Sequence, residues 1–169
     1  MEPIRTSMRR AAFTRPSNTT NYTKDDAMGK GSAALDCIME FPKPMASAGR
    51  TGKIVTSRLW KDDTGVTNDS FRLLLFQKLP ASDPDDNVGP STSFIKDADA
   101  GFYIGQIDYE TSFVGADAVH YEGQDLVPSS GIPFQSQDRN GGIYGILTAL
   151  AAYNPASGEI FTITLEIQE

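Results

Sequence analysis

A single histidine limits the acid–base chemistry that this chain can perform. His120 is the only histidine in the 169 residues, so any hydrolytic triad would depend on it. Asp117 and Glu122 lie near it in the sequence, but no G-x-S-x-G segment supplies the strained turn of a serine nucleophile. The sequence therefore does not favour a triad hydrolase, and we predict no catalytic residue.

The only cysteine, Cys37, lies among apolar residues in the segment LDCIM, where a thiol usually packs as a small buried side chain. One histidine and one cysteine exclude the usual structural zinc sites. A lone cysteine also excludes an intrachain disulfide, which fits assembly in a reducing compartment such as the cytoplasm.

Acidic residues offer two further kinds of site. Asp108 and Glu110 share a face if their segment is a strand, but with 22 acidic residues in the chain such pairs arise by chance. Asp83, Asp85 and Asn87 alternate as oxygen ligands do in calcium loops. An EF-hand, however, needs glycine at position 88 and glutamate at position 94, where this chain has valine and phenylalanine. We expect a solvated turn there, with calcium binding as the alternative.

The glycine pairs do not indicate a cofactor. Neither Gly29-Lys30-Gly31 nor Gly141-Gly142 matches a nucleotide-binding fingerprint, and no alternation of strands and helices surrounds them. We therefore predict no cofactor and no metal.

The charge distribution indicates what kind of partner the chain binds. The net charge of −7 argues against nucleic acid as a partner, because binding to phosphate depends on clustered lysine and arginine. Arginines nevertheless gather in the first fifteen residues, as Arg5, Arg9, Arg10 and Arg15. This asymmetry predicts an arm that docks on an acidic surface, and a mobile, solvated N-terminus is the alternative. No segment approaches the ~20 apolar residues that span a bilayer, so we also expect no membrane contact.

Periodicity predicts an all-β chain. The last segment, residues 160–168, alternates apolar and polar residues with a period of two. Residues 143–153 form an apolar segment between turn signals, which favours a strand over a helix and predicts a C-terminal hairpin. A second hairpin is predicted between residues 53–61 and 71–79, joined by the polar residues 62–70. The remaining strands are predicted at residues 9–14, 34–41, 101–109 and 116–121.

Both faces of the segment at residues 71–79 are partly apolar, which predicts an inner strand or a contact between subunits. Phe71, Leu73 and Leu75 are the residues that we expect either to fill the core or to pack against another subunit.

About eight strands separated by Gly, Pro, Asn and Asp clusters predict an antiparallel β-sandwich of the jelly-roll type. We divide the chain into an extended N-terminal arm with the first strand, residues 1–24, and a sandwich domain, residues 25–169.

Two segments, residues 7–22 (SMRRAAFTRPSNTTNY) and 151–162 (AAYNPASGEIFT), resemble small virion proteins of tailed bacteriophages. Together with residues 54–76 the resemblance covers about half of the chain. It implies a head decoration (cement) protein with a jelly-roll body, located on the capsid surface of the virion after assembly in the host cytoplasm. It also implies the major capsid protein as partner and a homotrimer as the assembled form. The basic arm would then lie against acidic capsid surface.

The alternative hypothesis is a carbohydrate- or receptor-binding sandwich at a tail or fibre. Its stacking platforms would be Trp60, Tyr103, Tyr109 or Tyr121, and it requires a cluster of exposed aromatic residues. A small hydrolase that uses acidic residues ranks below both.

Overall fold

The computed structural model describes residues 5–31, 33, 35–42, 49–62, 70–81, 84, 86–87, 97–114, 119–122, 130–137 and 142–169; for residues 97, 111–114 and 119–122 it describes the backbone alone. The described strands are β1 (Thr6–Thr14), β2 (Ala27–Met28), β3 (Met39–Phe41), β4 (Thr51–Lys61), β5 (Phe71–Phe76), β6 (Tyr103–Val114), β7 (Val119–Glu122), β8 (Ile132–Gln135), β9 (Ile143–Ala149) and β10 (Ile160–Gln168). The single described helix, α1 (Asp97–Ala100), has four residues. No helix in the described part of the chain is long and apolar enough to cross a membrane.

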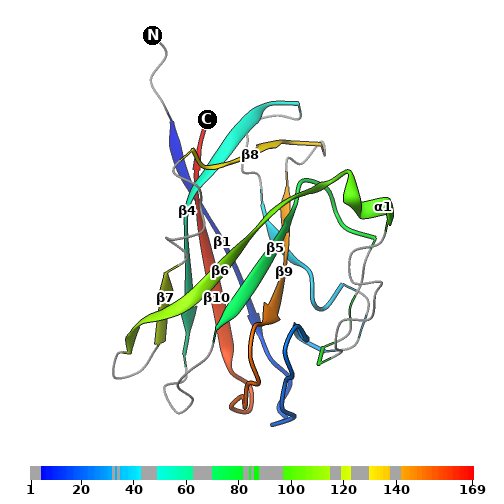
Figure 1. Ribbon diagram of the computed structural model, residues 1–169, viewed down its shortest axis with the longest axis vertical. Coiled ribbons are helices and arrows are strands. Elements are labelled where there is room, and N and C mark those ends of the chain that lie inside the picture. Colours follow the sequence, from blue (N-terminus) through cyan, green and yellow to red (C-terminus); the bar gives the residue numbers. More distant parts are fainter. Residues whose placement is uncertain are drawn as a thin grey trace.

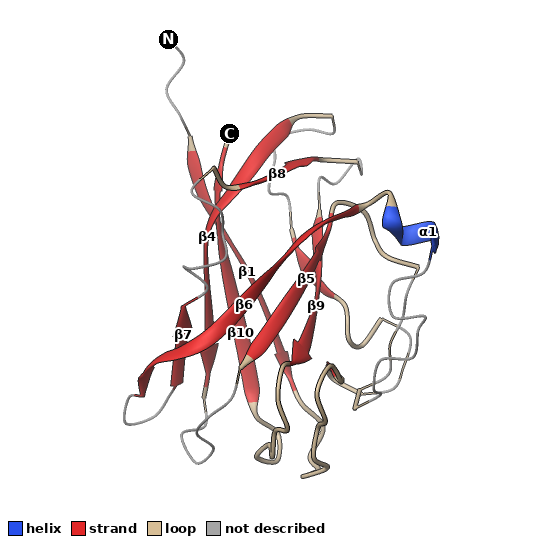
Figure 2. Ribbon diagram, in the orientation of Figure 1, coloured by secondary structure: helices blue, strands red, loops and turns tan. Residues whose placement is uncertain are grey.

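The strands form two antiparallel layers that face each other (Figures 1 and 2). In the first sheet the order is β1-β10-β4-β7, and β8 pairs with the other end of β4. In the second sheet β6, β5 and β9 lie side by side, and β2 and β3 both pair with β9. The long strand β6 belongs to both sheets, because its C-terminal part pairs with β7.

This strand order is that of a jelly roll. The first and last long strands are neighbours in one sheet, and the connections from β3 to β4, from β4 to β5 and from β9 to β10 each pass from one sheet to the other. The predicted fold class, an all-β antiparallel sandwich of the jelly-roll type, is therefore confirmed.

Both predicted hairpins are wrong. β9 pairs with β2, β3 and β5, whereas β10 pairs with β1 and β4. Likewise, β4 and β5 lie in different sheets. The turn signals mark correctly where the chain reverses, but a reversal does not determine whether the next strand stays in the same sheet.

Several predicted boundaries also change. The segment predicted at residues 34–41 is a strand only from Met39, because Leu35 has a φ of 69° and begins a turn closed by a hydrogen bond from Ile38 N to Leu35 O. The segment at residues 143–153 is a strand as predicted, but it ends at Ala149. The short strands β2 and β8 were not predicted from the sequence.

Residues 1–24, predicted as an N-terminal arm with the first strand, contain β1. Every residue of β1, from Thr6 to Thr14, pairs with β10 in an unbroken register. An arm free to extend would lack these ladder hydrogen bonds. Residues 1–4 of the predicted arm lie outside the described residues.

The core lies between the two sheets and takes in the inward side chains of both. Phe71, Leu73 and Leu75 are fully buried in it, so they pack within their own chain and do not form a subunit contact. On the other face of β5, Leu74 and Phe76 belong to a second apolar cluster. Its other members are Ala27, Cys37, Tyr144 and Ile146, with Ile38 and Tyr103 packed against it. The sequence prediction of an inner strand is confirmed, and the burial of Cys37 is confirmed with it.

Candidate binding surface

The first sheet has an outward side that the rest of the described chain does not cover, here called the outer face. Side chains alternate along β1, β10 and β4, so that every second residue points into the core and the others point outward. The outward residues of these strands are Thr6, Met8, Arg10, Ala12, Thr14, Ile160, Thr162, Thr164, Glu166, Gln168, Thr56, Arg58 and Trp60. The outer face is therefore a sheet surface of threonines with a few large side chains.

Three of these large side chains are apolar and exposed. Met8 is 56% exposed, Trp60 41% and Ile160 40%. The register places Ala12 opposite Thr162 and Thr162 opposite Trp60, so that the tryptophan lies in the same cross-strand row as the β1 edge. Exposed apolar side chains on one face, surrounded by polar residues, are typical of an interaction surface.

The outer face is also cationic toward its edge. Arg10 and Arg58 lie in one cross-strand row on either side of Thr164. Arg10 is exposed and donates a hydrogen bond of 3.4 Å to Thr162 Oγ1. Glu166 supplies the opposite charge one row away.

β1 forms one border of the first sheet, and among the described strands none lies beside its outer edge in the ladder. Arg15 N donates to Glu159 O, and Glu169 N donates to Arg5 O, so the odd-numbered residues exchange hydrogen bonds with β10. In an antiparallel ladder the intervening residues direct their N–H and C=O groups the opposite way. The backbone groups of Met8, Arg10 and Ala12 therefore point away from the sheet.

The predicted docking arginines occupy different environments. Arg5 and Arg10 are exposed, whereas Arg9 is half-buried and donates from Nη1 to Met8 O at 3.1 Å. Arg15 is only 2% exposed and is not available to a partner. The docking role predicted for Arg15 is therefore wrong, because its charge is used inside the fold.

Arg15 belongs to a buried polar network that links loops at the lower end of the sandwich in Figure 1. Its Nε donates to Tyr22 Oη at 2.6 Å, and its Nη1 donates to Ala156 O at 3.2 Å. Tyr22 Oη in turn donates to Asp86 Oδ1 at 2.6 Å. Burial is the main cause that raises the pKa of Tyr22, and the hydrogen bond to Asp86 adds to it. This network fixes loops far apart in the sequence.

A buried ion pair lies beside this network. Lys61 Nζ is 3.0 Å from Glu159 Oε1, and it donates to Tyr153 Oη at 3.3 Å. Tyr153 also donates to Glu159 Oε2 and stacks on Tyr22, with 5.9 Å between the ring centroids. Sequence reasoning missed this cluster. The sequence signal that could have located the cluster is the period of two in β4, because it directs the side chain of Lys61 inward, as it does that of Leu59.

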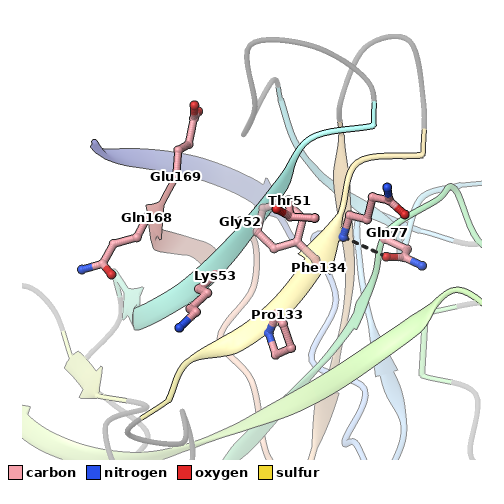
Figure 3. Close-up of a pocket in the computed structure, with 9 residues that line it drawn as sticks. Thr51, Gly52, Lys53, Gln77, Pro133, Phe134, Gln168 and Glu169 are labelled. Carbon is pink, nitrogen blue, oxygen red and sulfur yellow. Dashed lines mark hydrogen bonds between the residues drawn. The ribbon is translucent and has the colours of Figure 1, made fainter. Parts of the chain in front are cut away.

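A groove of about 640 Å³ opens at the upper end of the sandwich (Figure 3). It is lined by the start of β4, the strand β8 and the C-terminal residues, and its members are Thr51, Gly52, Lys53, Gln77, Pro133, Phe134, Gln135, Gln168 and Glu169. Gln135 N donates to Gln77 Oε1 at 3.1 Å, which ties β8 to the end of β5. Lys53 and Glu169 are the charged residues of the groove.

A second groove of about 440 Å³ runs beside the β1 edge. Arg10 and Ala12 line it on the β1 side, and Leu35 and Leu79, which are 48% and 43% exposed, line the opposite side. Lys30, Asp36 and Glu40 also line this groove, so the β1 edge adjoins a hollow of mixed polar and apolar character as well as the outer face.

The candidate catalytic carboxylates are not paired with each other. Asp108 accepts two hydrogen bonds from Arg72, at 2.6 and 2.7 Å, which join β5 to β6. These bonds raise the pKa of Arg72. Asp108 is therefore neutralised by an arginine and does not form an acid–base pair with Glu110. The backbone of His120 pairs with Trp60, and its side chain lies outside the described part.

Among the predicted stacking residues whose side chains are described, only Trp60 is exposed. Trp60 is exposed, but Tyr109 is fully buried, with its hydroxyl bonded to Ser57, and burial raises its pKa. Tyr103 is half-buried and packs on Phe76. The side chain of Tyr121 lies outside the described residues.

In the predicted calcium loop, Asp83 and Asp85 lie outside the described residues, and Asn87 has a φ of 62°. Within the described part of the chain no group of at least three His, Cys, Asp or Glu side chains is placed to hold a metal ion.

Comparison with known proteins gives similarity in structure alone. No family model matches the chain, and no curated protein matches its sequence. A solved structure of the 60-mer BFDV capsid protein is 14% identical with a TM-score of 0.38, covering 98% of this chain and 93% of that one. The Cyanophage Pam1 capsid asymmetric unit is 11% identical with a TM-score of 0.33, covering 98% and 84%.

A carbohydrate-binding module, the non-crystalline cellulose specific CBM28, is also similar, at 14% identity and a TM-score of 0.36, covering 90% of this chain and 71% of that one. The similar structures thus include both viral capsid proteins and a carbohydrate-binding module. Similarities of this size assign neither a family nor a function, and the fold assignment above rests on the strand order.

Proposed function

We propose that this chain is a non-enzymatic structural protein of a virus particle, and specifically a head decoration (cement) protein of a tailed phage that binds and stabilises the capsid shell. Residues 7–22 and 151–162 led us to expect this role from the sequence. The jelly-roll body is compatible with it, since viral capsid domains are among the proteins that use this fold. Fold alone does not determine function, so the proposal depends on the binding surface.

The observation that carries the proposal is the outer edge of β1, with which no described strand pairs. This edge is nine residues long, keeps an unbroken register, and contains neither proline nor glycine. Sheet edges that must stay free are usually protected by bulges, prolines, short length or charged side chains, and this edge has only the charges of Arg9 and Arg10. Such an edge is suited to receive an extended segment of another protein, which would complete the ladder.

The side chains around the edge define the partner. Arg10 is exposed at the edge, and Met8 is the most exposed large apolar side chain in the described part of the chain. The partner surface would therefore combine carboxylates with apolar side chains. A shell presents many copies of such a surface, so a trimeric decoration protein would sum weak contacts into firm attachment.

The test is co-sedimentation of the purified protein with assembled shells of its source virion. Met8→Pro removes one outward N–H and leaves the bonds to β10 intact, because the Met8 backbone points away from the sheet. Arg10→Glu reverses the charge at the same edge. Lys24→Glu, at an exposed lysine of a loop, is the matched control.

We expect binding to fall at least tenfold in Met8→Pro and in Arg10→Glu, and to be unchanged in Lys24→Glu. Light scattering should give the mass of a trimer. Shells that bind none of the four proteins, or all of them equally, would contradict the proposal.

A second function, glycan binding, is favoured by one observation. Trp60 is 41% exposed on the outer face, with Thr162 beside it in the cross-strand row. An exposed indole flanked by hydrogen-bonding groups can stack on a sugar ring. Retention on polysaccharide gels that is lost in Trp60→Ala and kept in Met8→Pro would favour this function over capsid attachment.

A further inference from the structure

The second groove, of about 440 Å³, lies on the inner side of the β1 edge. Ala11 and Phe13, whose side chains point into the sandwich, line it. Arg10 and Ala12 line it as well, and their backbone N–H and C=O groups point away from β10. No described strand pairs with this side of β1. The edge that could accept another strand therefore opens onto a hollow as well as onto the outer face.

The opposite wall of the second groove carries two exposed leucines. Leu35 is 48% exposed and Leu79 is 43% exposed. Ile38, which also lines the groove, packs against the second apolar cluster and gives this wall a fixed support. The charged residues of the groove away from β1 are Lys30, Asp36 and Glu40. The hollow thus offers apolar contacts among charged groups of both signs.

The backbone of Leu35 adopts a conformation that disfavours leucine. Its φ of 69° lies in the left-handed region, which glycine and asparagine adopt at lower cost. Burial of the side chain in the core could offset that cost, but almost half of this side chain is exposed. Neither the local backbone nor the core of the fold accounts for a leucine here. Backbone strain kept at an exposed apolar side chain indicates a contact with a partner.

An extended segment added to β1 would use both the edge and the groove. Successive side chains of a strand point to opposite faces of the sheet. Every second residue of the added strand would therefore face inward, as Ala11 and Phe13 do, and would enter the groove toward Leu35 and Leu79. The intervening residues would lie on the outer face beside Arg10. The two faces of the added strand would thus meet different chemistry.

Arg10 selects the residues that face outward. Its guanidinium is exposed and donates a hydrogen bond of 3.4 Å to Thr162 Oγ1. None of the ion pairs formed among the described residues includes Arg10. A carboxylate on the added strand would supply the missing anion. Because the guanidinium is exposed, this pair would contribute more to the choice of partner than to its affinity.

We propose that the β1 edge and the second groove bind one extended segment in which carboxylate and large apolar side chains alternate. The carboxylates face Arg10, and the apolar side chains pack against Leu35 and Leu79. The inference rests on the proposed attachment through the β1 edge and adds the chemistry of the segment that the edge accepts. A short peptide is sufficient for binding, because main-chain hydrogen bonds and side-chain contacts both come from a single strand.

The test uses the full chain and labelled peptides of the length of β1, with binding measured by fluorescence anisotropy. One peptide alternates glutamate and leucine, a second alternates lysine and leucine, and a third alternates glutamate and serine. Leu35→Asn and Leu79→Ser each remove one leucine of the groove. Asp25→Asn is the matched control, because it places the same residue at another positive φ, of 70°, outside the groove.

We expect saturable binding of the glutamate–leucine peptide, at least tenfold tighter than binding of the other two. Leu35→Asn and Leu79→Ser should each weaken it at least tenfold, and Asp25→Asn should bind as the unmodified chain does. The Tm of Leu35→Asn should equal or exceed that of the unmodified chain, because asparagine adopts the positive φ with less strain. If Leu35→Asn does not fold, Leu79→Ser decides the result. Absence of saturable binding, equal affinity for the three peptides, or undiminished binding by both leucine variants would overturn the proposal.

Co-sedimentation with shells distinguishes failure of this inference from failure of the proposed function. Shells that bind Leu35→Asn and Leu79→Ser as tightly as the unmodified chain, but do not bind Met8→Pro, would overturn the groove contact and leave attachment through the edge in place. Peptide binding that depends on both leucines, in a chain that binds no shells, would support the inference and contradict the attachment.

Discussion

Lys61 Nζ lies 3.0 Å from Glu159 Oε1, with both side chains fully buried, so the end of β4 is joined by an ion pair to the connection that precedes β10. The ammonium group also lies 5.0 Å from the centroid of the Tyr153 ring. A buried pair of this kind contributes little net stability against an apolar replacement, because desolvation offsets the attraction. Removing only one of the two charges lowers the free energy of unfolding substantially, because the other charge then stays buried without its partner.

Lys61→Met should therefore lower the free energy of unfolding by about 3–5 kcal/mol, since Glu159 would lose its cation. The double variant Lys61→Met with Glu159→Leu should recover most of that loss. Urea unfolding followed by circular dichroism measures both. A double variant no more stable than Lys61→Met would show that the pair itself, and not the unpaired charge, determines stability here.

Arg15 gives a second stability prediction. Arg15→Lys should cost about 1–3 kcal/mol, because a lysine cannot donate at once to Tyr22, Ala156 and Asn18 as the guanidinium does. The folded fraction of Arg15→Lys should bind shells with the same affinity as the unmodified chain, since Arg15 is buried. A loss of shell binding with unchanged stability would instead support the docking role that the sequence suggested.

Gly29 gives a third stability prediction. A Cβ at this position would lie 2.6 Å from Asp36 O and 2.7 Å from Cys37 Cα, and backbone atoms cannot yield as a side chain can. Gly29→Ala should therefore destabilise the fold by about 2–3 kcal/mol, within the usual cost of overpacking. Gly101→Ala is the control, since a Cβ added there would meet no atom of the described chain within 4 Å. Equal thermal midpoints for the two variants would contradict this prediction.

Local patterns predicted the strands well and their partners poorly. The period of two in residues 160–168 and the turn signals around it follow from short-range chemistry, and β10 forms where they indicate. Pairing of β10 with β1 joins the two ends of the chain, and no local signal encodes that contact. The predicted hairpin with β9 failed for this reason.

The candidate surface was predictable only in part. The arginines near the N-terminus are evident from composition, but their environments depend on strand direction and on loops far along the chain. Arg10 points outward from β1, whereas Arg15 lies against Tyr22 and Ala156. The apolar character of Phe71 and Leu73 was equally evident, but only the packing of the two sheets shows that they face their own core.

The buried tyrosines should lower the stability of the fold at alkaline pH. Burial raises the pKa of Tyr22 and of Tyr109 above the ordinary 10.0, so the folded chain holds these protons more tightly than the unfolded chain does. The stabilisation is fully present below about pH 10 and is lost as the pH rises further, because only the unfolded state releases the protons readily. The free energy of unfolding should thus fall steeply above about pH 10, and phenolate absorbance should appear together with loss of the β-sheet circular dichroism signal. Tyr109→Phe should make the fall less steep, since one linked proton is removed. Ionisation of every tyrosine near the ordinary pKa of 10.0 in a chain that stays folded would contradict this expectation.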